Sequence, residues 1–217
     1  MNKNTIIYTI IGVILIIGFL FLAYNLTSTP EKNVVYKETQ TLTSSDHIKW
    51  SPDKKNLLVE YSDLQCPACK AYHDVIKSQI ETASSGAEIT KKITFVYRHF
   101  PLSQHQYAQP AAYAAEAAGK QGKFYEMIDL IFEAQDSWSK SSNPNEEFVK
   151  MAQKLNLDMD KFKKDFDSQE VKNKVNQDYQ SGIQAQVRST PSFYLNGQKL
   201  DKVSSFDDFI KLLKEVK

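Results

Sequence analysis

Residues 57–69 read LLVEYSDLQCPAC and bring both cysteines of the chain directly behind a short apolar run. The run at residues 57–61 is largely apolar, which favours a buried β-strand. Beyond Cys69, apolar residues recur at helical spacing as far as Ile80. The sequence therefore predicts a strand, then a Cys-Pro-Ala-Cys segment, then a helix.

A cysteine pair at the start of a helix has a chemical rationale. The first helical turn has unpaired N–H groups and the positive end of the helix dipole, and both stabilise a thiolate. The pKa of Cys66 should therefore fall below the ~8.5 of a free thiol. Pro67 suits this turn because an N–H there would lack a partner. We predict that Cys66 attacks and that the more buried Cys69, about one turn on, resolves.

Three other uses of the cysteine pair stay open on spacing alone. A structural disulfide is one, although so short a loop constrains the unfolded chain little. A zinc site with His73, His99 or His105 is another, but His99 lies farther from Cys69 than the dozen or so residues typical of a zinc finger. A c-type haem site needs His directly after the second cysteine, where this chain has Lys70.

Two further positions are candidates for the same site. Glu60 ends the predicted strand, and it is either a carboxylate facing water or a buried acid whose raised pKa lets it exchange a proton with Cys69. Thr190-Pro191 precedes an apolar segment, where proline can simply start a strand. A cis bond occurs in only ~5% of X–Pro pairs, so the sequence alone does not assign one here.

The rest of the chain predicts an α/β fold with a helical block in its middle. A second strand is expected at residues 93–97, where the sequence alternates and favours β-structure. Helix-forming sequence follows from about 105 to 184, and its apolar stripes indicate core positions. Asn196-Gly197 then predicts a hairpin turn, and an amphipathic helix closes the chain. This order of elements indicates the α/β class.

The N-terminal end has an almost unbroken apolar run from Ile6 to Tyr24. We predict a transmembrane signal-anchor helix at residues 5–26, long enough for the ~30 Å hydrocarbon core, and a short cytoplasmic end at residues 1–4. The alternative is a cleaved signal peptide, which needs a small-residue cleavage site that we do not find. Residues 27–45 are polar and predict a linker, with one short strand around 34–36.

Charge excludes one class of partner. The chain has 27 basic and 26 acidic residues, and Lys3 is the one charged residue among the first 30. The remainder is therefore neutral and lacks the basic surface that nucleic-acid binding requires. With two cysteines, the chain is also no disulfide-dense secreted scaffold.

Several segments together resemble the DsbA-like branch of the thioredoxin superfamily. They occur in family order and are spread over most of residues 46–217, at 46–49, 59–70, 98–102, 114–124 and 190–197. The resemblance implies a thioredoxin fold at 46–217 with a helical insertion at about 103–184. It also implies that Pro191 is cis and faces the cysteines, that the Thr190 backbone pairs with a bound peptide, and that Glu60 is the buried acid. Pro67 and Ala68 would also contact substrate.

The chain departs from the family pattern at two places. Pro67-Ala68 separates the cysteines, whereas the most oxidising members place His before the second cysteine. Both glycines of the usual Gly-Val-x-Gly-Thr-Pro approach are replaced, by Gln186 and Ser189. These changes put a very high reduction potential in doubt and predict a stiffer, more polar loop.

The predicted function is a single-pass, membrane-anchored, extracytoplasmic thiol–disulfide oxidoreductase that introduces disulfides into exported proteins. The Cys66–Cys69 pair carries both electrons, so neither a cofactor nor a metal is predicted. The expected partners are unfolded exported proteins with free thiols, and a DsbB-like or VKOR-like membrane quinone reductase. The alternatives are a reductase or isomerase fed by a membrane electron donor, and a non-catalytic thioredoxin-like peptide-binding module.

Overall fold

A computed structural model describes residues 2–27, 34–53, 55–201, 203 and 205–217. The chain divides into two units, one ending at Val34 and one running from Val35 to Lys217. The first unit contains helix α1, Lys3–Thr27. Nowhere in the described residues is a helix both long and apolar enough to cross a membrane. The predicted membrane-spanning helix is therefore not confirmed.

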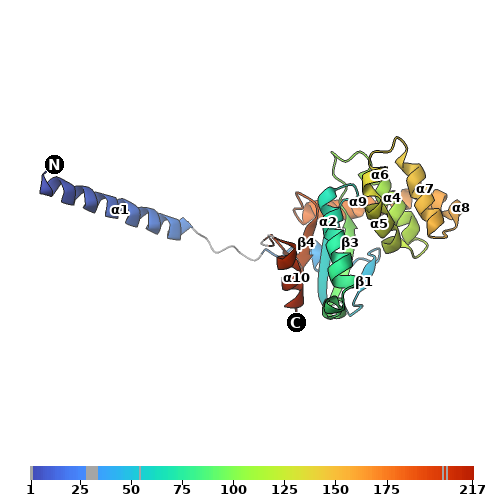
Figure 1. Ribbon diagram of the computed structural model, residues 1–217, viewed down its shortest axis with the longest axis horizontal. Helices are drawn as coiled ribbons and strands as arrows, with labels where there is room; N and C mark the ends of the chain where they lie inside the picture. Colours follow the sequence, from blue (N-terminus) through green and yellow to red (C-terminus); the bar gives the residue numbers. More distant parts are fainter. Residues whose placement is uncertain (1, 28–33, 54, 202, 204) are drawn as a thin grey trace. The chain divides into compact units, whose positions relative to one another are not determined.

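The second unit is built on a mixed five-stranded sheet in the order β1-β3-β2-β4-β5 (Figure 1). Central strands β2 (Asn56–Ser62) and β3 (Ile93–His99) run parallel, and every residue of both is buried. The other three strands, all antiparallel to their neighbours, are β1 (Ile48–Trp50), β4 (Ser192–Leu195) and β5 (Gln198–Lys199). The two strands predicted at 57–61 and 93–97 thus form the centre of the sheet.

Helices cover the sheet and form the insertion. Helix α2 (Pro67–Val75) continues as a π-helical segment, Ile76–Glu81, and Figure 1 places it across one face of the sheet. Helix α3 (Ala87–Lys92) leads into β3, and α10 (Phe206–Lys214) ends the fold. The insertion contains α4 (Ala108–Gly119), α5 (Phe124–Glu133), α6 (Gln135–Trp138), α7 (Pro144–Lys154), α8 (Met159–Phe166) and α9 (Gln169–Gln184). These helices lie within the stretch predicted at about 103–184.

The alternation of β2 decides which side chains face the cysteines. Leu58 belongs to the apolar cluster that contains Cys66 and Cys69, whereas Leu57, Val59 and Tyr61 belong to a second cluster on the opposite face. Successive side chains of a strand point to opposite faces. Glu60 and Ser62 therefore share the face of Leu58 and point toward the cysteines.

Residues 35–45 belong to the main unit, so the predicted linker at 27–45 is too long. Val35 bridges to Gln198, and Thr39 is fully buried. The buried Arg98 side chain donates to the carbonyl oxygens of Glu38 (2.6 Å) and Thr41 (3.1 Å). The backbone carbonyls of this segment bind a buried guanidinium, and the polar sequence alone does not distinguish that role from a tether. Residues 28–33 lie outside the described part of the chain.

Candidate active site

Cys66 occupies the N-cap of α2, and Pro67 follows at the first helical position. The Cys66 carbonyl accepts the first helical hydrogen bond from Lys70 N (3.1 Å), so the predicted helix begins where the cysteine pair does. Both cysteines are free thiols. Pro67 and Ala68 are exposed between them, which leaves the dipeptide open to a substrate.

The Cys66 thiol faces Thr190. Its Sγ donates to the Thr190 carbonyl oxygen (3.5 Å), and the Thr190–Pro191 peptide bond is cis. The pKa of Cys66 is lowered to about 5, chiefly by a hydrogen bond from the Cys69 thiol to the thiolate. Burial opposes this change, while the Thr190 side chain and the N–H groups of Cys69 and Ala68 support it. Cys66 is therefore the ionised sulfur of the pair near neutral pH. It is also the less buried one, at 7% exposed against 0% for Cys69.

Cys69 has the opposite character. It is completely buried, and the Asp63 N–H donates to its Sγ (3.4 Å). Burial raises the pKa of Cys69 well above its usual value, and the neighbouring Cys66 thiolate and the Glu60 charge add to the increase. Cys69 therefore stays a protonated thiol when Cys66 is a thiolate, as a resolving cysteine should.

Glu60 lies in the interior and not at the surface, which decides between its two predicted environments. The residue is 3% exposed, and its register partners on the neighbouring strands are Tyr97 and Phe193. Burial raises the pKa of Glu60 to about 7. The Ser62 side chain lowers this pKa, whereas the negative charge of Cys66 raises it further. Its carboxyl group can therefore both hold and release a proton at neutral pH.

The three histidines considered as metal ligands are not gathered at the cysteines. His73 pairs with Asp129 (3.3 Å), His99 with Glu116 (3.2 Å) and His105 with Asp63 (2.8 Å). His99, Glu116 and Asp178 do form a buried cluster on another part of the fold, with ligand atoms within 4.8 Å. In that cluster, Lys174 Nζ bonds both Asp178 carboxylate oxygens at 2.7 Å and supplies the positive charge.

Sequence reasoning missed the residues that hold the loop between β2 and α2. Gln135 of α6 donates to the carbonyl oxygens of Leu64 (2.8 Å) and Cys66 (3.1 Å). The Asp63 carboxylate accepts a bond from His105, for which the sequence suggested only a possible role as a zinc ligand. These partners lie tens of residues from the cysteines, so no local pattern reveals them.

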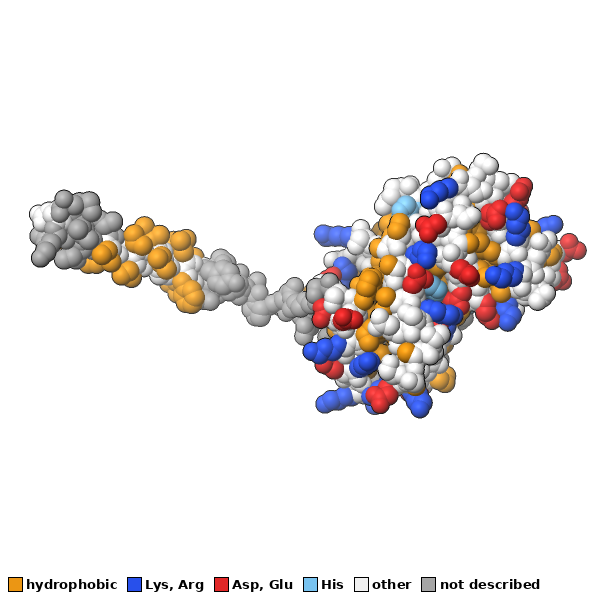
Figure 2. All heavy atoms as spheres, in the orientation of Figure 1, with side chains coloured by type: hydrophobic (Ala, Val, Ile, Leu, Met, Phe, Trp, Pro, Cys, Tyr) orange, Lys and Arg blue, Asp and Glu red, His pale blue; other side chains and the backbone are white. Residues whose placement is uncertain are grey.

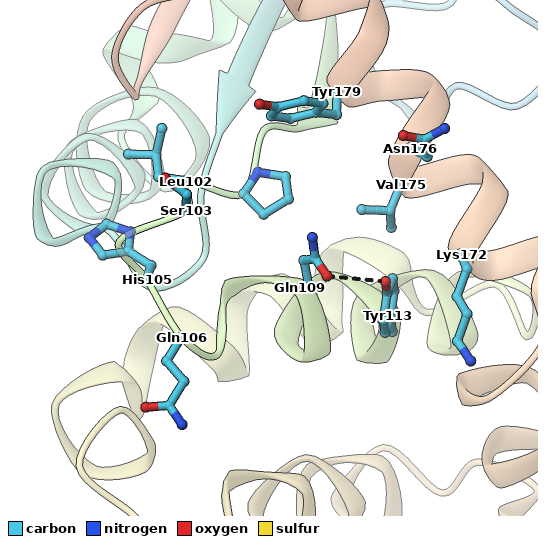
Figure 3. Close-up of a pocket in the computed structure, with 11 residues that line it drawn as sticks. Leu102, Ser103, His105, Gln106, Gln109, Tyr113, Lys172, Val175, Asn176 and Tyr179 are labelled. Atoms are coloured by element: carbon cyan, nitrogen blue, oxygen red, sulfur yellow. Dashed lines mark hydrogen bonds between the residues drawn. The ribbon is translucent and has the colours of Figure 1, made fainter.

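Two hollows flank this region. One of about 270 Å³ includes Tyr72, Ser189, Pro191 and Phe193 in its lining and lies beside the cis proline. The other, about 440 Å³, lies between the segment after β3 and helices α4 and α9 (Figure 3). On the face of the main unit shown in Figure 2, acidic and basic side chains are intermixed, in keeping with the neutral sequence.

The thioredoxin family's sequence profile matches residues 43–215. The chain belongs to the thioredoxin family. Among solved structures, this thioredoxin-family chain resembles α-DsbA1 of Wolbachia pipientis, with a TM-score of 0.67 and 20% identity over 83% of this chain and 95% of that one. Oxidised BdbD of Bacillus subtilis gives a TM-score of 0.65 and 18% identity over 81% and 95%. The predicted thioredoxin-superfamily membership is confirmed, and these likenesses show that the chain shares the fold of DsbA-like structures.

The curated relatives that this chain matches are much longer proteins. One stretch is 32% identical over 155 residues to a Na⁺/H⁺ antiporter NhaA 3 of Salinispora tropica, covering 71% of this chain and 22% of that protein. An NhaA 1 of Mycobacterium sp. (strain KMS) is 33% identical over 159 residues, with 24% of its length covered. The chain thus spans about a fifth to a quarter of the curated relatives it matches.

Proposed function

We propose that this chain is a dithiol oxidase that introduces disulfides into exported proteins. The observation that carries the proposal is the geometry of the pair. Cys66 caps helix α2 and faces the Thr190 carbonyl before the cis proline, whereas Cys69 is fully buried. This placement lowers the pKa of Cys66 to about 5 and raises that of Cys69 well above the usual value. A stabilised Cys66 thiolate favours the reduced form of the pair, and a protein with a favoured reduced form oxidises its substrates.

The reaction exchanges one disulfide for another. A substrate thiolate attacks Cys66 Sγ, the new S–S bond forms, and the Cys66–Cys69 bond breaks with its electron pair on Cys69 Sγ. A second substrate thiolate then attacks the substrate sulfur of this mixed disulfide and releases Cys66 as a thiolate. The substrate loses two electrons and the cysteine pair gains them, so no bound cofactor is required.

Glu60 serves the proton balance of this cycle. Cys69 leaves as a thiolate in a fully buried position, where its charge is costly, and it needs a proton. Glu60 shares the face of β2 toward the cysteines, and its pKa of about 7 lets it supply that proton and recover it on reoxidation.

The substrate would be an extended, unfolded segment with a free thiol. Exposed Pro67 and Ala68 leave room beside Cys66, and the hollow beside Pro191 offers both aromatic and polar lining to neighbouring side chains. The Thr190 backbone next to Cys66 would pair with the main chain of the substrate. Recognition through main-chain groups suits an enzyme that serves many sequences.

Export and tethering are proposed from the sequence. The charge-free run from Ile6 to Tyr24 supports an anchor at residues 5–26 that keeps the domain on the extracytoplasmic face of the cell membrane. A DsbB-like or VKOR-like quinone reductase in the same membrane would then reoxidise the pair. We expect the protein to stay with membranes in high salt and alkaline carbonate, with its N-terminus intact. Release of a form that begins near residues 24–30 would instead indicate a cleaved signal.

Cysteine variants of the full-length chain in detergent test the activity. The wild type should oxidise a reduced, unfolded protein, whereas Cys66→Ser should lose this activity entirely. Cys69→Ser should accumulate a mixed disulfide through Cys66, visible on a non-reducing gel and absent from the double variant. Undiminished oxidation by Cys66→Ser would exclude the proposed role of Cys66. A wild type without oxidase activity would instead favour the non-catalytic peptide-binding alternative.

A further inference from the structure

Asp63 connects both cysteines to the helical insertion. Its side chain is 0% exposed, and its buried carboxylate accepts three hydrogen bonds. One oxygen accepts from Gln65 N (2.7 Å), and the other accepts from Leu102 N (2.8 Å) and His105 Nδ1 (2.8 Å). The carboxylate is therefore held from both sides, and two of its three donors come from the segment that leads into the insertion.

The backbone of the same residue contacts the reacting pair. The Asp63 N–H donates to Cys69 Sγ (3.4 Å), and the Asp63 carbonyl accepts from Cys66 N (3.0 Å). Fixing the side chain restricts the rotation of the backbone to which it is attached. The direction of the Asp63 N–H thus depends on the donors that hold its carboxylate.

His105 is the donor that can be changed without opening the core. Its side chain is 20% exposed, and Figure 3 places its ring at one end of the pocket between the segment after β3 and helices α4 and α9. The carboxylate is an acceptor, so Nδ1 carries the hydrogen of this bond. The contact closes a chain of bonds from His105 through Asp63 to Cys69 Sγ.

We propose that Asp63 is a positioning residue for thiol–disulfide exchange, held by His105 so that its N–H stabilises Cys69 as it leaves. The inference rests on the proposed function and adds these two residues to it. When substrate sulfur bonds to Cys66, the electron pair of the old S–S bond goes to Cys69 Sγ, and negative charge appears where water has no access. A donor already aimed at that sulfur stabilises the charge without rearrangement. A thiolate that is better stabilised leaves faster.

Two His105 variants test the role of the Nδ1 donor in the full-length chain. Asparagine places its amide N–H where Nδ1 lies, whereas leucine offers no donor. We measure the rate at which reduced glutathione opens the Cys66–Cys69 disulfide, using acid quench and alkylation. His105→Leu should slow this reaction about threefold to tenfold, the size expected for weakening one hydrogen bond to a charged group. His105→Asn should stay within about twofold of the wild type.

A matched histidine and a second readout separate positioning from general damage. His73 also pairs with a carboxylate, Asp129 at 3.3 Å, but makes no hydrogen bond to the 62–66 loop, so His73→Leu should react at the wild-type rate. The pH dependence of Cys66 alkylation should keep its midpoint near 5 in every variant. A collapsed loop would move that midpoint together with the rate.

Several outcomes would overturn the inference. They are a wild-type rate for His105→Leu, an equal loss in His105→Asn, or a shifted Cys66 midpoint in the slow variant. If His105→Leu does not fold, Asp63→Asn decides. The asparagine replaces one of the two carboxylate oxygens with an NH2 group, so it cannot accept from Gln65 on one side and from Leu102 and His105 on the other, and the same slowing is required of it. If the wild-type disulfide does not exchange with glutathione, the proposed function is refuted. The comparison of the His105 variants tests only the positioning role, and its failure would leave the proposed function standing.

Discussion

At the scale of single residues, Glu60 has the most unusual environment of the site. Its carboxyl group lies in the sheet interior, and burial raises its pKa from 4.5 to about 7. Between pH 4.5 and pH 7, the Glu60 carboxyl group is therefore mostly protonated in the folded protein and mostly charged in the unfolded chain. Burying the Glu60 carboxylate costs free energy, and this cost falls beside Cys69, the residue that exchanges a proton in the proposed cycle.

Glu60→Gln should reveal this cost as a change in the pH dependence of stability. The folded wild type binds its proton more tightly than the unfolded chain, so its free energy of unfolding falls as pH rises from about 4.5 to about 7. The difference between those pKa values corresponds to about 3 kcal/mol. Urea unfolding of the oxidised proteins should show that the free energy of unfolding of Glu60→Gln, relative to that of the wild type, rises by about 3 kcal/mol between pH 4.5 and pH 8. Parallel pH profiles would contradict a buried, titrating Glu60.

At the scale of elements, α9 brings the end of the insertion back onto the sheet. Gly182 of α9 lies so close to β2 and β3 that an added Cβ would come within 2.5 Å of the Phe100 ring and 3.1 Å of the Tyr61 ring. The neighbouring Ser181 hydroxyl bonds the Tyr61 hydroxyl (2.9 Å). The close approach places α9 directly over the strand that carries Glu60 and leads to the cysteines.

Gly182→Ala should therefore lower stability even though alanine favours helix. The added methyl group must displace buried aromatic rings, and overpacking of this kind costs about 1–3 kcal/mol. Urea unfolding should show that loss, whereas Gln184→Ala, at an exposed position two residues on, should change stability by less than about 0.5 kcal/mol. Equal stability of Gly182→Ala and the wild type would contradict the close packing of α9.

The elements also mark the limit of what the sequence could predict. Strand β2, the Cys-Pro-Ala-Cys segment and the start of α2 follow from adjacent residues, because strand composition and helix-start chemistry are local. The burial of Glu60 could not be decided locally, because it depends on the neighbouring strands that cover it, which lie far away in the sequence. Short strand β1 and the attachment of residues 38–41 to Arg98 escaped prediction because their partners lie about 45–60 residues away. The short strand predicted around 34–36 corresponds to the bridge between Val35 and Gln198.

At the scale of the whole molecule, the insertion does more than enlarge the fold. Gln135 of the insertion and His105 at its entry both bond the loop that carries Cys66, and α9 packs against the central strands. The thioredoxin core supplies the cysteines, Glu60 and the cis proline. The insertion holds the loop in which the cysteines react, so the two parts contribute to one site.

Equilibrium of the full-length protein with glutathione redox buffers, read by thiol alkylation, tests the central claim most directly. A Cys66 pKa lowered to about 5 stabilises the thiolate, and with it the reduced form of the pair, more than the pKa of ~7 does in thioredoxin. We therefore predict a potential less negative than that of thioredoxin, which favours oxidation of exported thiols. A potential near −270 mV, that of thioredoxin, would contradict the oxidase account and favour a reductase.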